Sequence, residues 1–181
     1  MADRPSSERL SERLRKIKPK GFQAKVYRIL ARHYQRQPLS LQGSLGLGGR
    51  YNPPYQFGAL YCGLNEAVCW AEIEKKHEGP IRRDRFKLIP LHVRLTKVLD
   101  LTDLELLGRL QVAPEALTDP IDHSLTRRIA HEAREAGFEG IFWPPLRRGP
   151  EPYWRSLWIE WRPLQKSRSQ LFAGPCDGVD G

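Results

Sequence analysis

A glycine-rich stretch ending in an arginine most constrains what this chain can fold into. Four glycines between residues 43 and 49 precede Arg50, and glycine tolerates positive φ and lets the backbone approach a ligand closely. The stretch lacks both the Lys-Ser/Thr ending of a P-loop and the GxGxxG context of a dinucleotide fold, so alone it predicts a flexible turn. Arg50 is the residue that this turn would present to a phosphate, whose oxygens a guanidinium can fork.

The segment after this loop predicts a strand and then a helix. Residues 59–62 are a short run bounded by glycines, as strands often are, and they carry Tyr61 to one face. Asn65 suits a helix N-cap, and residues 66–76 combine helical propensity with apolar positions. Glu72 lies inside that helix among apolar neighbours. An acid there can point outward into solvent, pair with an arginine or serve chemistry.

The remaining elements indicate an α+β protein. Further strands are predicted at residues 86–93, 97–101 and 155–161. Thr102 and Glu105 form a capping box that predicts a short helix, and a longer helix at 122–136 ends at Gly137. At 181 residues the chain is long enough for one domain with its own core.

The order of these residues resembles the RES domain family, the toxin half of a class of bacterial toxin–antitoxin pairs. That family places an Arg on an early strand, then a Gly-x-Arg-aromatic-Asn loop, a strand with Tyr and a helix with Glu. The matching residues here are Arg28, Gly48, Arg50, Tyr51, Asn52, Tyr61, Ala67 and Glu72. Pro144 and Arg147 fit the turn that closes the family's pattern, whereas Pro145 stands where the family has a Ser.

The resemblance implies one compact domain over residues 22–162 with an ADP-ribosyltransferase-like fold, and an enzyme that consumes NAD. Such enzymes break the nicotinamide–ribose bond, so NAD is the substrate and no further cofactor is implied. Glu72 would stabilise the oxocarbenium-like ribose. The resemblance gives catalytic roles also to Arg50 and Tyr61, and substrate-binding roles to Arg28, Tyr51, Asn52 and Arg147.

Several points stay open beside this hypothesis. The acceptor can be phosphate, water or a protein, and homo-oligomer formation is undetermined. Arg28 can equally be a strand residue facing solvent, and Tyr61 an ordinary core residue. Because Pro145 supplies neither a hydroxyl nor a backbone N–H, the chain can also be a catalytically weak module that binds nucleotide or protein. The implied partner is a separately encoded antitoxin.

A net charge of +9 and a pI near 9.7 raise a third hypothesis, a nucleic-acid-binding protein. No helix-turn-helix, zinc-finger or RNP pattern accompanies the basic residues, so direct nucleic-acid binding is not expected. Part of the charge lies in a basic arm at residues 1–21. Leu10, Leu14 and Ile17 have helical spacing there, so the arm is either a docked amphipathic helix or solvated.

Other side chains point to no metal or disulfide. The three cysteines are scattered without CxxC spacing, and the five histidines form no ligand pattern. His123 and His131 are predicted to be surface residues. The chain has no apolar run near 18 residues and no signal core, which predicts a cytoplasmic protein. Residues 163–181 predict a flexible tail.

Overall fold

The computed structural model describes residues 6–76, 80–143, 156–159 and 170–172. Five helices, six strands and three single-turn 3-10 helices follow one another in these residues. In chain order they are α1 (Ser6–Arg15), β1 (Lys20–Ala31), η1 (Arg32–Tyr34), α2 (Gln42–Leu47), β2 (Leu60–Gly63), α3 (Glu66–Lys76), η2 (Arg83–Arg85), β3 (Phe86–Asp100), α4 (Leu104–Leu110), η3 (Pro114–Leu117), α5 (Ser124–Glu135), β4 (Gly140–Trp143), β5 (Ser156–Ile159) and β6 (Gln170–Phe172). The α+β class predicted from the sequence is confirmed.

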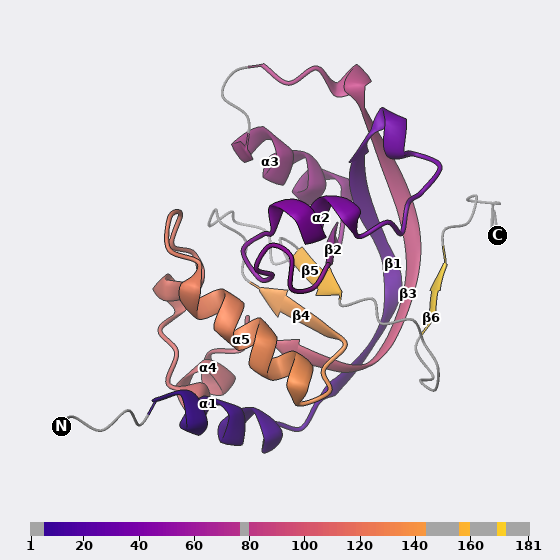
Figure 1. Cartoon of the computed structure of the whole chain (residues 1–181). Coiled ribbons are helices and arrows are strands. Elements are labelled where there is room, and N and C mark those ends of the chain that lie inside the picture. The colour runs from indigo at the N-terminus through magenta and orange to yellow at the C-terminus, as the bar shows by residue number, and fades with distance from the viewer. Residues whose placement is uncertain (1–5, 77–79, 144–155, 160–169, 173–181) are drawn as a thin grey trace.

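The six strands form one sheet in the order β1-β2-β5-β4-β3-β6, and β1 also pairs with β3. This extra pairing closes the first five strands into a ring. All neighbours are antiparallel except β3 and β4, which are parallel. In Figure 1 the long strands β1 and β3 form a curved ribbon along one side, α3 lies near one end of it, and α1, α4 and α5 gather near the other.

The two strands predicted at 86–93 and 97–101 are one strand, β3. The polar residues at the predicted break coincide with a register shift, because Phe22 pairs with Leu95 whereas Lys20 pairs with Val98. A single carboxylate satisfies the backbone at this irregularity. Oε2 of Glu139 accepts from the N–H groups of Thr96 and Lys97, at 2.6 and 3.0 Å. The strand therefore continues through the break.

Local signals gave most of the other elements correctly. The predicted helix at 66–76 is α3, and its N-cap Asn65 accepts from the Val68 N–H at 2.8 Å. The helix at 122–136 is α5, and Gly137 follows it with φ of 85°. The predicted N-cap of α4 was wrong, because Asp103, not Thr102, accepts from the first N–H groups of the helix.

The glycine-rich stretch is not a flexible turn over its whole length, because α2 occupies residues 42–47. The loop that follows satisfies its free carbonyls. Asn52 Nδ2 donates to the Ser44 carbonyl at 2.7 Å, and the Tyr55 N–H donates to the Leu45 carbonyl at 2.6 Å. These tertiary bonds offset the low helix propensity of two glycines.

The basic arm contains the helix α1, which docks on the body. Leu10, Leu14 and Ile17 are buried in the larger of two apolar clusters, together with residues of α4 and α5. Arg13 adds polar contacts, donating to the Leu110 carbonyl and to the side chain of Gln111. Strand β1 begins at Lys20, so the predicted boundary at 21/22 falls inside a strand.

Two further predictions concern the tail and the cysteines. Three residues of the tail predicted to be flexible, 170–172, form the edge strand β6 against β3. Cys62 and Cys69 are buried free thiols, as expected of small core residues. In the described part of the chain, no helix has both the length and the apolar character needed to cross a membrane.

Removing the apolar side chain that α1 buries most completely should destabilise the whole domain. Leu14 has no exposed surface, and Leu→Ala at such sites costs about 2–5 kcal/mol. We expect Leu14→Ala to lower the denaturant midpoint, measured by circular dichroism. The exposed neighbour Arg15 gives the control, Arg15→Ala; equal stability of the two variants would indicate a solvated arm instead.

Candidate functional site

The loop between α2 and β2 is built around a buried amide. Asn52 has no exposed surface. Its Nδ2 donates to the carbonyls of Ser44 and Phe57, at 2.7 and 3.0 Å, and its Oδ1 accepts from the Tyr61 hydroxyl at 2.7 Å. One side chain thus ties the end of α2, the loop and β2 together.

Two glycines let the loop turn tightly against Tyr61. Gly48 has φ of 68°, which disfavours other residues. A Cβ at Gly49 would overlap the Tyr61 hydroxyl and lie 2.9 Å from Asn52 Oδ1. The Tyr61 hydroxyl also accepts from the Tyr51 N–H at 3.1 Å. Burial raises the pKa of Tyr61 above its ordinary value, so the phenol stays neutral and keeps donating to Asn52.

The loop directs Arg50 toward the segment before α5, and α5 holds it there. Arg50 Nη1 donates to the carbonyls of Leu117 and Asp119, at 3.1 and 2.7 Å. In return, the Thr126 hydroxyl donates to the Arg50 carbonyl at 2.6 Å, and Arg127 Nε donates to the Gly49 carbonyl at 3.0 Å. The Nη2 and Nε donors of Arg50 make no hydrogen bond with the residues described.

These elements enclose a cavity of about 590 Å³, within the range of small-molecule sites. Four residues predicted for the site line it, namely Arg28, Arg50, Tyr61 and Glu72. Trp143 and His123 complete the wall opposite the glycine loop. A second pocket of about 100 Å³ adjoins it, and Tyr61, Glu72 and Trp143 line both. The site therefore joins β1, β2, α3, β4 and the start of α5.

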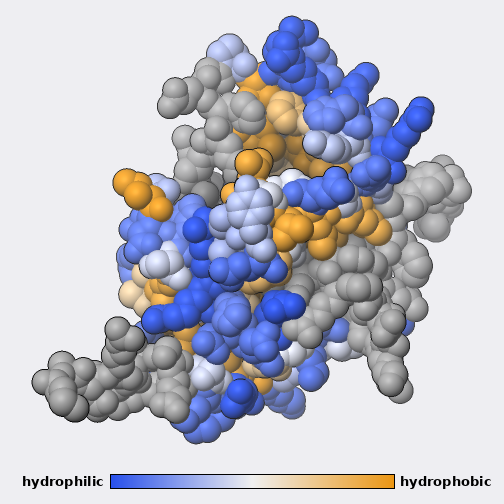
Figure 2. Space-filling model, viewed as in Figure 1, coloured by the Kyte–Doolittle hydropathy of each residue, from blue (hydrophilic) through white to orange (hydrophobic). Residues whose placement is uncertain are grey.

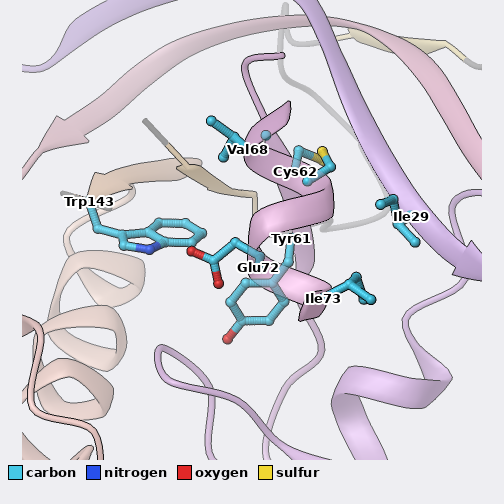
Figure 3. Close-up of a pocket in the computed structure, with 9 residues that line it drawn as sticks. Ile29, Tyr61, Cys62, Val68, Glu72, Ile73 and Trp143 are labelled. Carbon is cyan, nitrogen blue, oxygen red and sulfur yellow. The ribbon is translucent and has the colours of Figure 1, made fainter. Parts of the chain in front are cut away.

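Glu72 presents its carboxylate to this cavity. Figure 3 shows the carboxylate projecting from α3 toward the space between the Trp143 indole and the Tyr61 ring. The residue is half-buried, and within the described ranges it has neither an ion pair nor a hydrogen bond. Ile29, Val68 and Ile73 give the adjoining pocket apolar walls. Among the described residues, Glu72 is the one acid that lines the cavity. Such a carboxylate is suited to stabilise a cation.

Arg28 is neither solvent-facing nor entirely free. It is buried on β1, its Nη1 donates to the Pro38 carbonyl, and its Nη2 donates to the Ser40 carbonyl at 2.8 Å. Burial lowers the pKa of Arg28 from its ordinary value, but a guanidinium remains charged at neutral pH. Arg28 therefore anchors the segment after β1 and places positive charge at the cavity.

His123 lines the cavity, although the sequence predicted a surface residue. It is the N-cap of α5 and half-buried, and its Nε2 is buried without a hydrogen-bond partner in the described structure. Burial, with Arg50 and Arg127 nearby, lowers the pKa of His123 below its usual value. The ring is thus neutral at pH 7. The sequence around His123 does not indicate its burial or its place in the cavity. One neighbouring cation, Arg127, lies one helical turn later, but the other, Arg50, comes from the distant glycine loop.

Tyr51 and Asn52 lie behind the cavity wall. Both have no exposed surface, so the predicted direct contact with substrate does not fit their places. Tyr51 packs on Trp143 with ring centroids 5.2 Å apart, and we assign both residues a supporting role. Arg147 and Pro145 lie outside the described residues.

The buried thiols at the site are not nucleophiles. Burial raises the pKa of Cys62 to about 12 and that of Cys69 to about 11. Thiols with such pKa values stay protonated at neutral pH, whereas reactive cysteines are thiolates. Their protonated state disfavours either cysteine as a nucleophile.

Adding one methyl group at the glycine loop should damage the site. Gly49→Ala forces the Tyr61 hydroxyl and Asn52 apart, and we expect a loss of about 1–3 kcal/mol in unfolding free energy. Gly46→Ala is the matched control, because a Cβ there meets nothing within 4 Å and α2 should gain about 0.5–1 kcal/mol. Equal denaturant midpoints for the two variants would contradict the close approach.

His123 should make stability depend on pH in a defined direction. The pKa of His123 is lower in the folded protein than in the unfolded chain. As the pH drops below about 6.5, the unfolded chain therefore binds the proton first, and the free energy of unfolding decreases as the pH decreases. We expect His123→Gln to flatten the stability curve between pH 7 and 5, measured by urea unfolding. His131→Gln, exposed on the same helix, is the control; curves of the same slope for both variants would refute the assignment.

Comparison with known proteins agrees with this geometry. The RES domain family model matches residues 25–162. The crystal structure of the M. tuberculosis MbcT-MbcA toxin-antitoxin complex contains a chain with a TM-score of 0.71 and 22% identity, covering 91% of this chain and 90% of that one. No curated protein matches significantly. The family match spans most of the chain and includes Arg28, Arg50, Tyr61 and Glu72, and so the chain belongs to the RES domain family.

Proposed function

We propose that this protein is an NAD-consuming toxin that breaks the nicotinamide–ribose bond. The observation that carries the proposal is the cavity that Glu72 lines together with Arg28, Arg50 and Tyr61. An anionic dinucleotide needs cations for its phosphates and a carboxylate for its ribose when that sugar becomes cationic. The RES family membership supports the same activity.

Each residue has a distinct part in this proposal. The C1′–N bond breaks with its electron pair going to the ring nitrogen, so nicotinamide leaves uncharged and positive charge develops on the ribose. The Glu72 carboxylate stabilises that charge, while the Nη2 and Nε donors of Arg50 bind the pyrophosphate. Arg28 contributes charge and shapes the cavity. An acceptor oxygen then attacks C1′ and gives up its proton.

The aromatic wall excludes water from the reacting bond. Tyr61 and Trp143 stand edge to face, with ring centroids 5.8 Å apart. Tyr61 is fixed by its bonds to Asn52 and to the Tyr51 backbone, so the wall is rigid before substrate arrives. A nicotinamide ring can pack against it, and low local polarity strengthens the attraction between Glu72 and the ribose cation.

The partner that we propose is a cognate antitoxin. The chain similar to this one was crystallised in a toxin-antitoxin complex, and a free NAD-consuming enzyme would deplete the cell that makes it. Growth arrest on expression of the chain alone, relieved by a neighbouring gene, would support this partner.

Replacing the Glu72 carboxylate by an amide should abolish catalysis but keep the fold. We expect Glu72→Gln to release nicotinamide from NAD at least 100-fold more slowly, since an electrostatic group of this kind contributes about 2.7–4 kcal/mol. Adding phosphate should accelerate wild-type release if phosphate is the acceptor, and leave it unchanged if water is. The measurement is nicotinamide formation by chromatography.

Glu74→Gln is the matched control, because Glu74 lies on the same helix but is exposed and bonded to Arg83. Its rate should equal the wild-type rate. Full activity of the Glu72→Gln protein would remove Glu72 from the mechanism. Bound but uncleaved NAD in the wild type would instead indicate the catalytically weak module.

A further inference from the structure

The end of the β1–β3 ribbon that lies away from α1 in Figure 1 carries a concentration of basic residues. Ala31 pairs with Phe86 at this end, the chain leaves through η1, and it returns through η2. We call residues 32–36 and 82–87 the ribbon tip. Its exposed basic side chains are Arg32, His33, Arg36, Arg82, Arg83, Arg85 and Lys87. Figure 2 shows strongly hydrophilic side chains projecting along this edge of the molecule.

Few acids offset this charge in the described structure. Asp84 pairs with Arg82 at 2.9 Å, and Glu74 pairs with Arg83 at 2.7 Å. The other four Arg and Lys side chains of the ribbon tip form no ion pair with a described residue. Their mutual repulsion opposes the compact state, and a polyanionic partner would relieve it. The four are Arg32, Arg36, Arg85 and Lys87.

The cations are held on a rigid frame. Residues 28–31 of β1 pair with residues 86–89 of β3, and among the described residues no third strand extends along these pairs. The Arg83 guanidinium lies 4.6 Å from the Trp70 ring centroid, which fixes η2 against α3. The ribbon tip therefore consists of η1, η2 and the start of β3, held on the paired end of a two-stranded antiparallel ribbon.

We propose that the ribbon tip docks on duplex DNA. The paired residues 28–31 and 86–89 behind the tip form a two-stranded ribbon, an element that the major groove of B-form DNA admits and the deep, narrow major groove of RNA duplexes does not. Five of its six permanent cations are arginines, whose forked donors match phosphate oxygens. Tyr34 is 46% exposed beside them, its ring tilted against that of His33 with centroids 4.1 Å apart, and it adds a contact surface.

This inference goes beyond NAD cleavage and does not depend on it. None of the ribbon tip residues lines the cavity. The tip supplies phosphate contacts, which orient a protein on DNA but do not read its sequence. The binding is accordingly expected to be weak, independent of sequence and strongly sensitive to salt.

The test is fluorescence anisotropy of the full chain with a labelled random-sequence duplex between 50 and 300 mM salt. A tip variant changes Arg32, Arg36, Arg85 and Lys87 to Gln. A control variant removes the same charge from the exposed residues Arg15, Lys16, Arg109 and Arg128. Each lost phosphate contact should reduce the slope of log affinity against log salt by about 0.9.

We expect the tip variant to bind at least 10-fold more weakly at 100 mM salt, with a slope smaller by about 2–4, and the control variant to stay within about threefold of the wild type. Thermal unfolding checks that both variants fold. Equal weakening in the two variants would overturn the proposal, as would no wild-type binding at 50 mM salt. Competition by polyglutamate or by duplex RNA as effective as that by DNA would also overturn it, assigning the tip to an acidic protein or to RNA.

Discussion

The buried amide of Asn52 is the interaction on which the site depends. Its three hydrogen bonds join the end of α2, the loop at Phe57 and the Tyr61 hydroxyl on β2. A hydrogen bond of this kind contributes about 0.5–1.5 kcal/mol to stability, and losing the amide would remove all three. Because the amide satisfies all of these groups at once, the glycine loop takes one conformation and Arg50 leaves it in one direction.

A second constraint acts from α5. Thr126 and Arg127 bind the backbone of Arg50 and Gly49, while the Arg50 side chain binds the segment before α5. The bonds run both ways, so neither the loop nor the start of α5 can move alone. The pKa of His123 is lowered mainly by burial, and this coupling brings Arg50 close enough to lower it further. The same bonds thus set the shape of the cavity and its charge.

The sequence predicted the elements whose signals are local. The N-cap Asn65, the helical periodicity of α3 and α5 and the glycine after α5 each act within a few residues. It failed where a distant partner decides the outcome. Helix α2 depends on the loop after it, and the continuity of β3 depends on Glu139, more than 40 residues away. A short-range pattern cannot contain that information.

The residues of the candidate site likewise divide into those that a sequence pattern identifies and those that only the fold identifies. Of the residues that the family pattern marked, Arg28, Arg50, Tyr61 and Glu72 line the cavity. The pattern could not distinguish residues that face the cavity from those that hold it, which is why Tyr51 and Asn52 were assigned to substrate. Burial makes that distinction, and burial is a property of the fold. His123 was missed for the same reason, because burial and the approach of Arg50 depend on how α5 packs against the loop.

The arrangement of Arg50 shows why a partly occupied guanidinium suits a binding site. Its Nη1 is fixed on two carbonyls, so the side chain loses its rotamer freedom on folding and not on binding. Immobilising such a side chain costs about 0.5–1.5 kcal/mol, and binding to a preorganised one avoids that cost. Arg50 also lines the cavity. In the proposed function, the hydrogen bonds of Nη1 would therefore preorganise Arg50 for an anionic ligand.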